Sequence, residues 1–182
     1  MTSVDLTSNY FDVFDLPVSF DINLSDLSER FRRLQSIVHP DNFASSGDAE
    51  RRLSVQQSAL INEAYQTLRT PLARAMYMLA LQGWDMSRDS ETAMDQGFLM
   101  QQMELRESLA EISAASDASN ALLEFNQRVE QITAAIYAEL KPLLAQLTES
   151  GEVLNQAKDL VRRLQFLSKL QQESQGLEEQ LL

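Results

Sequence analysis

The sequence contains no cysteine and a single histidine, His39, in 182 residues. Without cysteine the chain can form no disulfide and offers no thiolate for catalysis, for a zinc ribbon or for an iron–sulfur cluster. With one histidine it can build neither a His–His metal site nor the paired Glu-x-x-His motifs of di-iron bundles. We therefore predict that the protein holds no metal ion and no other cofactor.

Glycine and proline are also scarce, with 5 and 4 residues, and the sequence has no glycine-rich phosphate-binding loop. No Gly-x-Ser-x-Gly turn accompanies His39, so a Ser-His-Asp triad is not indicated. No apolar run reaches the length of about 18 residues that a membrane-spanning helix needs. These absences predict a protein that is not an enzyme and does not cross a membrane.

Basic residues are in the minority. The chain has 15 Lys and Arg against 27 Asp and Glu, which gives a formal net charge of −12 and a pI near 4.4. Such a charge disfavours sequence-independent binding to nucleic acid or to an anionic membrane. The first ten residues lack the basic and apolar regions of an export signal. We therefore expect a cytoplasmic protein without a nucleic-acid or membrane partner.

Hydrophobic residues make up 44% of the chain and recur at helical spacing nearly throughout, which predicts an all-α fold. The first long helix begins near Ser25, a candidate N-cap, and ends near Val38, because Pro40 disfavours helical backbone at the residue before it. A second helix follows, and the two are expected to form an antiparallel hairpin. The apolar stripe of this second helix comprises Leu53, Gln57, Leu60, Ile61, Ala64 and Leu68.

A further helix is indicated by Thr70, Pro71 and Gly83, which have the positions of an N-cap, a first helical residue and a C-terminal cap. The apolar pattern then breaks and resumes in a second half that resembles a small bundle. The predicted parts are a first domain, a linker and a three-helix bundle, at residues 1–83, 84–89 and 90–182.

The bundle helices are expected from about Met94 to Ala114, from near Asp117 onward, and from Gly151 towards the C-terminus. Pro142 should kink or split the second of them, since a proline inside a helix removes one hydrogen bond and clashes with the preceding turn.

The tripeptide His39-Pro40-Asp41 lies between the two hairpin helices, and the first of these helices carries Arg30, Arg32 and Arg33 on its outer face. Ordinary loop chemistry explains the tripeptide equally well when it is considered alone: proline ends a helix, aspartate forms turns, and the histidine is incidental. The surrounding sequence must therefore show whether the tripeptide is an ordinary loop or a binding site.

In context, this half of the chain resembles the J-domain of DnaJ-type co-chaperones. The aromatic opening at residues 10–16 matches the short first helix of that domain, and Asn62-Glu63-Ala64-Tyr65-Gln66-Thr67-Leu68-Arg69 resembles a segment near the end of its third helix. The resemblance implies that the His39-Pro40-Asp41 loop docks on a DnaK-type ATPase and stimulates ATP hydrolysis there. It also implies an electrostatic docking face, composed of Arg30, Arg32 and Arg33. The chain departs from many J-domains at Asn42, where they carry a basic residue.

The first bundle helix has two faces at 100° per residue. One face is a core stripe made of Phe98, Leu105, Leu109 and Ile112. The other carries Leu99, Met100 and Met103, together with Glu104, Glu107 and Glu111. Large apolar residues opposite a core stripe indicate a second contact, either with a partner or with other parts of this chain. On the third bundle helix, Phe166 and Leu170 are expected on the face opposite its core stripe.

The chain as a whole resembles the HscB family of iron–sulfur cluster co-chaperones. The features that carry this resemblance are the J-domain-like first half, the acidic bundle, and the segments Phe98-Leu99-Met100 and Arg163-Leu164-Gln165-Phe166-Leu167. The resemblance implies that the bundle binds the scaffold protein IscU and that the J-domain stimulates a specialised DnaK-type chaperone, HscA. The implied scaffold-binding residues are Leu99, Met100, Met103 and Phe166, with Glu104, Glu107 and Glu111 as an acidic rim. Eukaryotic relatives carry an N-terminal Cys-x-x-Cys extension, so a chain without cysteine is expected to be of the bacterial type.

Two other functions remain open at this point. A general J-domain co-chaperone would deliver unfolded clients to a DnaK-type chaperone and would have no fixed partner. A structural or oligomerising helical protein would carry the tripeptide by accident.

Overall fold

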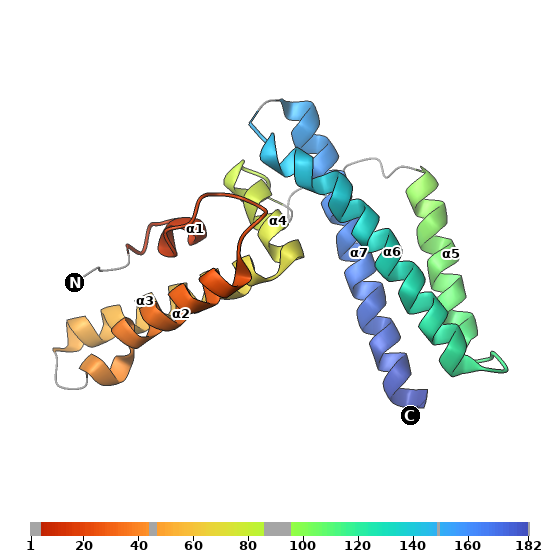
Figure 1. The fold of residues 1–182 in the computed structure, drawn as a ribbon, viewed down its shortest axis with the longest axis horizontal. Helices are drawn as coiled ribbons and strands as arrows, with labels where there is room; N and C mark the ends of the chain where they lie inside the picture. Colours follow the sequence, from red (N-terminus) through yellow and green to blue (C-terminus); the bar gives the residue numbers. More distant parts are fainter. Residues whose placement is uncertain (1–4, 44–46, 86–95, 149, 182) are drawn as a thin grey trace. The chain divides into compact units, whose positions relative to one another are not determined.

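The computed structural model describes residues 5–43, 47–85, 96–148 and 150–181. Within these ranges the chain is helical and has no β-strand, which confirms the all-α prediction. It divides into two compact units, residues 1–78 and 79–182, and each is described by itself (Figure 1). Most of the predicted linker lies outside the described residues, so the limits 1–83, 84–89 and 90–182 stay a prediction. No helix in the described ranges has both the length and the apolar character that crossing a membrane requires.

The first unit is built around a helical hairpin, in which α2 runs alongside α3 (Figure 1). Its ring stack of Phe31 on Tyr65, with centroids 4.1 Å apart, joins the two helices, and Gln35 Nε2 donates to Asn62 Oδ1 at 2.8 Å. The elements in this part of the chain are α1 (Tyr10–Val13), α2 (Leu24–Val38), the 3-10 helix η1 (Pro40–Phe43), α3 (Asp48–Arg69) and α4 (Pro71–Leu81).

The start of α2 differs from the prediction by two residues. The N-cap is Asn23, whose Oδ1 accepts from the backbone nitrogens of Ser25 and Asp26 at 2.9 and 3.2 Å. An asparagine at this position satisfies donors that the helix itself leaves unpaired, so Ser25 lies inside the first turn. The predicted end at Val38 is confirmed.

The buried stripe of α3 contains Gln57, Ile61, Ala64 and Leu68 as predicted. It begins at Ser54 and not at Leu53, and Leu60 is half-buried. Leu53 is 42% exposed, whereas its neighbour Ser54 is 1% exposed. The residues that face the unit interior lie three or four positions apart, as a helix face requires, and Leu53 is one position off that row. The buried members of the row are Ser54, Gln57, Ile61, Ala64 and Leu68.

Both ends of α4 match the sequence signals. Pro71 is its first residue, and Gly83 has φ +84°, the left-handed conformation that glycine adopts without strain. Gly83 N donates to Ala80 O at 2.9 Å and Trp84 N to Leu79 O at 3.2 Å, which are the two bonds of a Schellman cap. The pattern that ends this helix is therefore encoded locally.

The second unit contains a three-helix bundle, made of α5 (Gln96–Ile112), α6 (Ala118–Ala145) and α7 (Gly151–Leu181) (Figure 1). Each of the three helices contacts the other two, so the core runs along their shared axis. Its buried side chains include Leu105, Leu109, Leu122, Phe125, Val129, Ile136, Leu140, Ala157, Leu164 and Leu167.

The proline of α6 does not split the helix, which continues through Pro142 to Ala145. Pro142 lies in the last turn of the helix. Leu140 and Leu144, on either side of it, are buried in the bundle core at 0% and 3% exposure. Packing of these side chains offsets the single backbone hydrogen bond that proline removes.

The prediction that Leu170 lies on the outer face of α7 is wrong, because its side chain is buried at 1% exposure. It follows Leu167 by three residues and so extends the core stripe of α7 by one turn. Because α7 contacts both α5 and α6, its buried face is wider than one neighbour would require.

Candidate functional site

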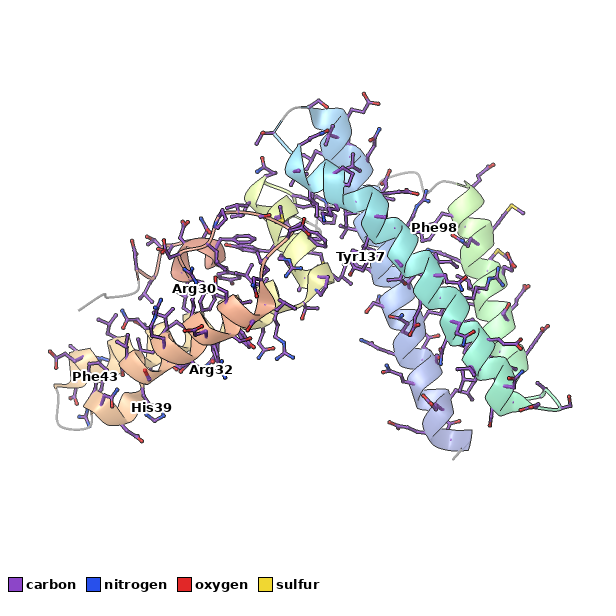
Figure 2. All side chains as sticks on the ribbon, viewed as in Figure 1. Arg30, Arg32, His39, Phe43, Phe98 and Tyr137 are labelled. Carbon is purple, nitrogen blue, oxygen red and sulfur yellow. The ribbon has the colours of Figure 1, made fainter. Side chains whose placement is uncertain are left out.

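The His39-Pro40-Asp41 loop is exposed at the end of the α2–α3 hairpin (Figure 2). The side chains of His39 and Asp41 are 55% and 89% exposed. The backbone nitrogen of Asp41 donates to His39 Nδ1 at 3.3 Å. The Asp41 carboxylate lies 3.5 Å from the same Nδ1 atom, so the loop presents an exposed imidazole and an exposed carboxylate beside each other.

Asn42 anchors this loop to the C-terminal end of α2. Its Nδ2 donates to the carbonyl oxygen of Ser36 at 2.8 Å and, more weakly, to that of Ile37 at 3.4 Å. These are among the last carbonyls of α2, which have no partner within the helix. The residue that departs from the usual J-domain pattern thus anchors the loop, a role that its sequence position did not reveal.

The three predicted docking arginines do not have the same surroundings. Arg30 Nη1 donates to the carbonyl oxygens of Phe14 and Asp15, both at 2.9 Å, and its Nε lies 3.0 Å from the Asp26 carboxylate, which raises the pKa of the guanidinium. In Figure 2, Arg30 lies on the α1 side of α2 and Arg32 on the opposite side. Arg32 and Arg33 are exposed. Arg30 is therefore a clamp between α1 and α2, and the exposed cations are the other two.

We expect Arg30→Ala to lower the melting temperature of the protein by several degrees, because the clamp also holds Asp15, whose φ of 52° is unusual for a residue with a side chain. Arg32→Ala should leave the melting temperature unchanged and slow only association with an acidic partner surface. Thermal unfolding followed by circular dichroism compares the two variants. Equal melting temperatures would contradict the clamp.

The outer face of α5 carries a small apolar surface, which we call the α5 patch: Leu99, Met100 and Met103. These side chains are 40%, 73% and 63% exposed. The predicted core stripe on the other face of the helix is confirmed, with Phe98, Leu105, Leu109 and Ile112 all buried. The α5 patch is therefore not part of the bundle core.

Phe166 lies at the edge of the core and is half-buried. Its ring meets the buried ring of Phe98 edge-on, with centroids 5.9 Å apart. The Arg106 guanidinium lies 5.6 Å from the Phe166 centroid, and that of Arg163 lies 5.1 Å from the Phe98 centroid, within the range of cation–π attraction. Sequence reasoning assigned these two arginines no role, although Arg163 precedes Phe166 by three residues and so shares its side of α7.

The predicted acidic rim divides into two kinds of residue. Glu104 Oε1 accepts from Arg128 Nη2 on α6 at 2.7 Å, so an internal cation already partners this carboxylate. Glu107 and Glu111 are exposed and remain available to a cation outside the chain. Among the described residues, no group of histidine and carboxylate side chains is arranged to hold a metal ion.

The chain is similar to proteins of one family over nearly its full length. A family model described as "HSCB C-terminal oligomerisation domain" matches residues 94–175. A "Co-chaperone protein HscB homolog" of Shewanella halifaxensis is 44% identical over 95% of this chain and 98% of that protein. A protein with the same description from Vibrio cholerae is 45% identical over 96% of this chain and 99% of its own length.

Two solved structures have similar folds. "Chaperone HscB from Vibrio cholerae" is 44% identical, with a TM-score of 0.84, and the match covers 96% of this chain and 100% of that one. The human co-chaperone protein HscB is 29% identical, with a TM-score of 0.86, over 98% of this chain and 85% of the human chain. Both units are therefore included in the similarity.

Proposed function

Because the chain belongs to the HscB co-chaperone family, with an N-terminal J-domain and a C-terminal helical domain, we propose that it couples an iron–sulfur scaffold protein to a specialised chaperone ATPase. The scaffold is of the IscU type and the chaperone is of the HscA type. The bundle binds the scaffold, and the J-domain stimulates ATP hydrolysis by the chaperone. The reaction takes place on the chaperone, so this chain supplies contacts and no catalytic residue.

The observation that carries the proposal is the exposure of the α5 patch opposite a complete core stripe. Exposed large apolar side chains gathered on one face mark interaction surfaces in water-soluble proteins. Methionine adapts its shape to an irregular partner, and Met100 and Met103 are the most exposed large hydrophobic residues in the described part of the chain, at 73% and 63%. The neighbouring carboxylates of Glu107 and Glu111 would select a partner with a basic rim.

At the J-domain, the His39-Pro40-Asp41 loop and the exposed arginines have complementary tasks. Arg32 and Arg33 attract an acidic surface of the ATPase and accelerate encounter. The imidazole of His39 and the carboxylate of Asp41 then form short-range bonds, and the Asn42 anchor holds the loop that carries them. Different side chains therefore attract the ATPase and stimulate its hydrolysis of ATP.

The direct test is to titrate the purified chain into the HscA-type chaperone with ATP, in the presence and absence of the IscU-type scaffold. The rate of ATP hydrolysis should rise with the chain alone and should rise further when the scaffold is present. A rate that does not respond to the chain would contradict the proposal. Capture from cell lysate separates it from a general J-domain co-chaperone, which would retain many clients in place of one dominant scaffold.

Self-association is a second candidate, because the family model that matches residues 94–175 is described as an oligomerisation domain. The α5 patch would then meet a second copy of the chain. Light scattering of the purified protein decides this point: a stable oligomer that leaves ATP hydrolysis unchanged would favour a structural role.

A further inference from the structure

A hollow of about 380 Å³ opens between the end of α5 and the start of α6. The small side chains of Ala115 and Ala121 leave this space near the turn that joins the helices, and Ile112 and Phe125 form the rest of its apolar lining. The polar residues around it are Ser108, Glu111, Glu124 and Arg128. A space of this size accommodates one long side chain.

The charges around the hollow favour a cation. Arg128 is the basic residue of the lining, and its guanidinium is held by Glu104. Glu111 is exposed, and Glu124 accepts a hydrogen bond from the neutral amide of Asn120 at 3.0 Å, so the lining carries two carboxylates and one guanidinium. Lysine and arginine place an aliphatic stem on apolar surface and keep the charged head at the rim. The hollow offers an apolar floor to the aliphatic stem of such a side chain and two carboxylates at its edge to the charged head.

The hollow and the α5 patch both lie along α5. Glu104 follows Met103 directly on α5, and its ion pair with Arg128, at 2.7 Å, joins the patch to the lining of the hollow. Glu111 lies eight residues after Met103, about 12 Å along the helix axis. A partner that covers the patch therefore reaches the hollow without leaving α5.

We propose that this hollow receives a lysine or arginine side chain of the scaffold protein bound at the α5 patch. The inference rests on the proposed function and adds a second, charge-selective contact to it. The basic side chain lies with its stem on Phe125 and Ala121 and its head between Glu111 and Glu124. Two contacts about 12 Å apart along α5 fix the direction in which the scaffold lies on the helix, which one apolar patch alone would not do.

The test measures binding of purified IscU-type scaffold to the full chain by calorimetry. Glu124→Gln should weaken binding by about two- to fivefold, as expected for one exposed charge contact, and should reduce its salt dependence. Ala121→Leu fills the hollow without changing charge and should weaken binding by at least about fivefold. Glu130→Gln is the matched control, since this exposed glutamate lies six residues after Glu124 and therefore about 120° away from it around α6.

Charge reversal identifies the occupant. Glu124→Lys should bind weakly to the native scaffold, and one Lys→Glu or Arg→Glu variant of the scaffold should restore its affinity. If Glu124→Gln and Ala121→Leu bind as tightly as the unchanged protein while α5-patch variants bind weakly, the hollow is not occupied and the proposed function stands. If the unchanged protein binds no scaffold, both inferences are overturned.

Discussion

Replacement of His39 by glutamine is expected to reduce the stimulation of ATP hydrolysis by at least about tenfold, which corresponds to about 1.4 kcal/mol of lost coupling. The exposed imidazole is oriented by the hydrogen bond from the backbone nitrogen of Asp41 to Nδ1, at 3.3 Å, and lies 3.5 Å from the Asp41 carboxylate. A glutamine side chain is flexible and cannot make this internal bond in the same geometry. The chaperone ATPase, measured at saturating ATP over a range of co-chaperone concentrations, reports the change.

Stability should not change in this variant, because the His39 side chain is 55% exposed and substitutions at exposed sites of this kind shift the free energy of unfolding by less than about 0.5 kcal/mol. Scaffold binding should also be retained, since the α5 patch belongs to the other unit. Gln66→Ala, at an exposed position of α3, serves as the control. Full stimulation by the glutamine variant would refute the role assigned to His39.

The second large effect is expected at the α5 patch. A Met100→Ala, Met103→Ala double variant should weaken scaffold binding by about 1.4–2.8 kcal/mol, or tenfold to a hundredfold in Kd, since truncated apolar anchors at the centre of an interface cost this much. Both side chains are mostly exposed, at 73% and 63%, so their loss should leave the melting temperature unchanged. Calorimetry with the purified scaffold, together with thermal unfolding, measures both quantities.

Leu123→Ala is the matched control for this variant, because Leu123 is likewise a large apolar side chain, 55% exposed, on another helix of the bundle. It should bind scaffold normally. Phe166→Ala should behave differently from the methionine variants and lower the melting temperature as well as affinity, since it removes the edge-on contact with Phe98 and the Arg106 contact. Unaltered affinity in the methionine double variant, or a large loss of its stability, would show that the patch is not a partner surface.

Much of the fold could be predicted because its signals are local. Proline at position 40 ends α2 through the backbone of its neighbour, and the Pro71 and Gly83 pair marks α4. The core stripe of α5 follows from 100° periodicity alone. Where such signals were incomplete, the prediction erred by a few residues, as at the N-cap of α2, or by one face, as at Leu170.

The roles of charged residues were harder to predict. Arg30, Arg32 and Arg33 received the same role from the sequence, but it is Arg30 that donates to the carbonyl oxygens of Phe14 and Asp15. Glu104 was predicted as part of an acidic rim for the scaffold, and within the chain it pairs with Arg128, 24 positions away in the sequence. A charged side chain takes the partner that folding brings within reach, and no spacing rule along one helix specifies it.

The sequence alone determined where the helices form, which α5 residues face the core and which remain outside it, because these depend on interactions between residues at most one or two helical turns apart. Tertiary structure alone decided that Arg30 is a clamp, that Phe166 rests on Phe98 and that a hollow opens between α5 and α6. Each of these features requires side chains from different helices to meet, and such meetings depend on how the helices pack rather than on the periodicity of any one of them.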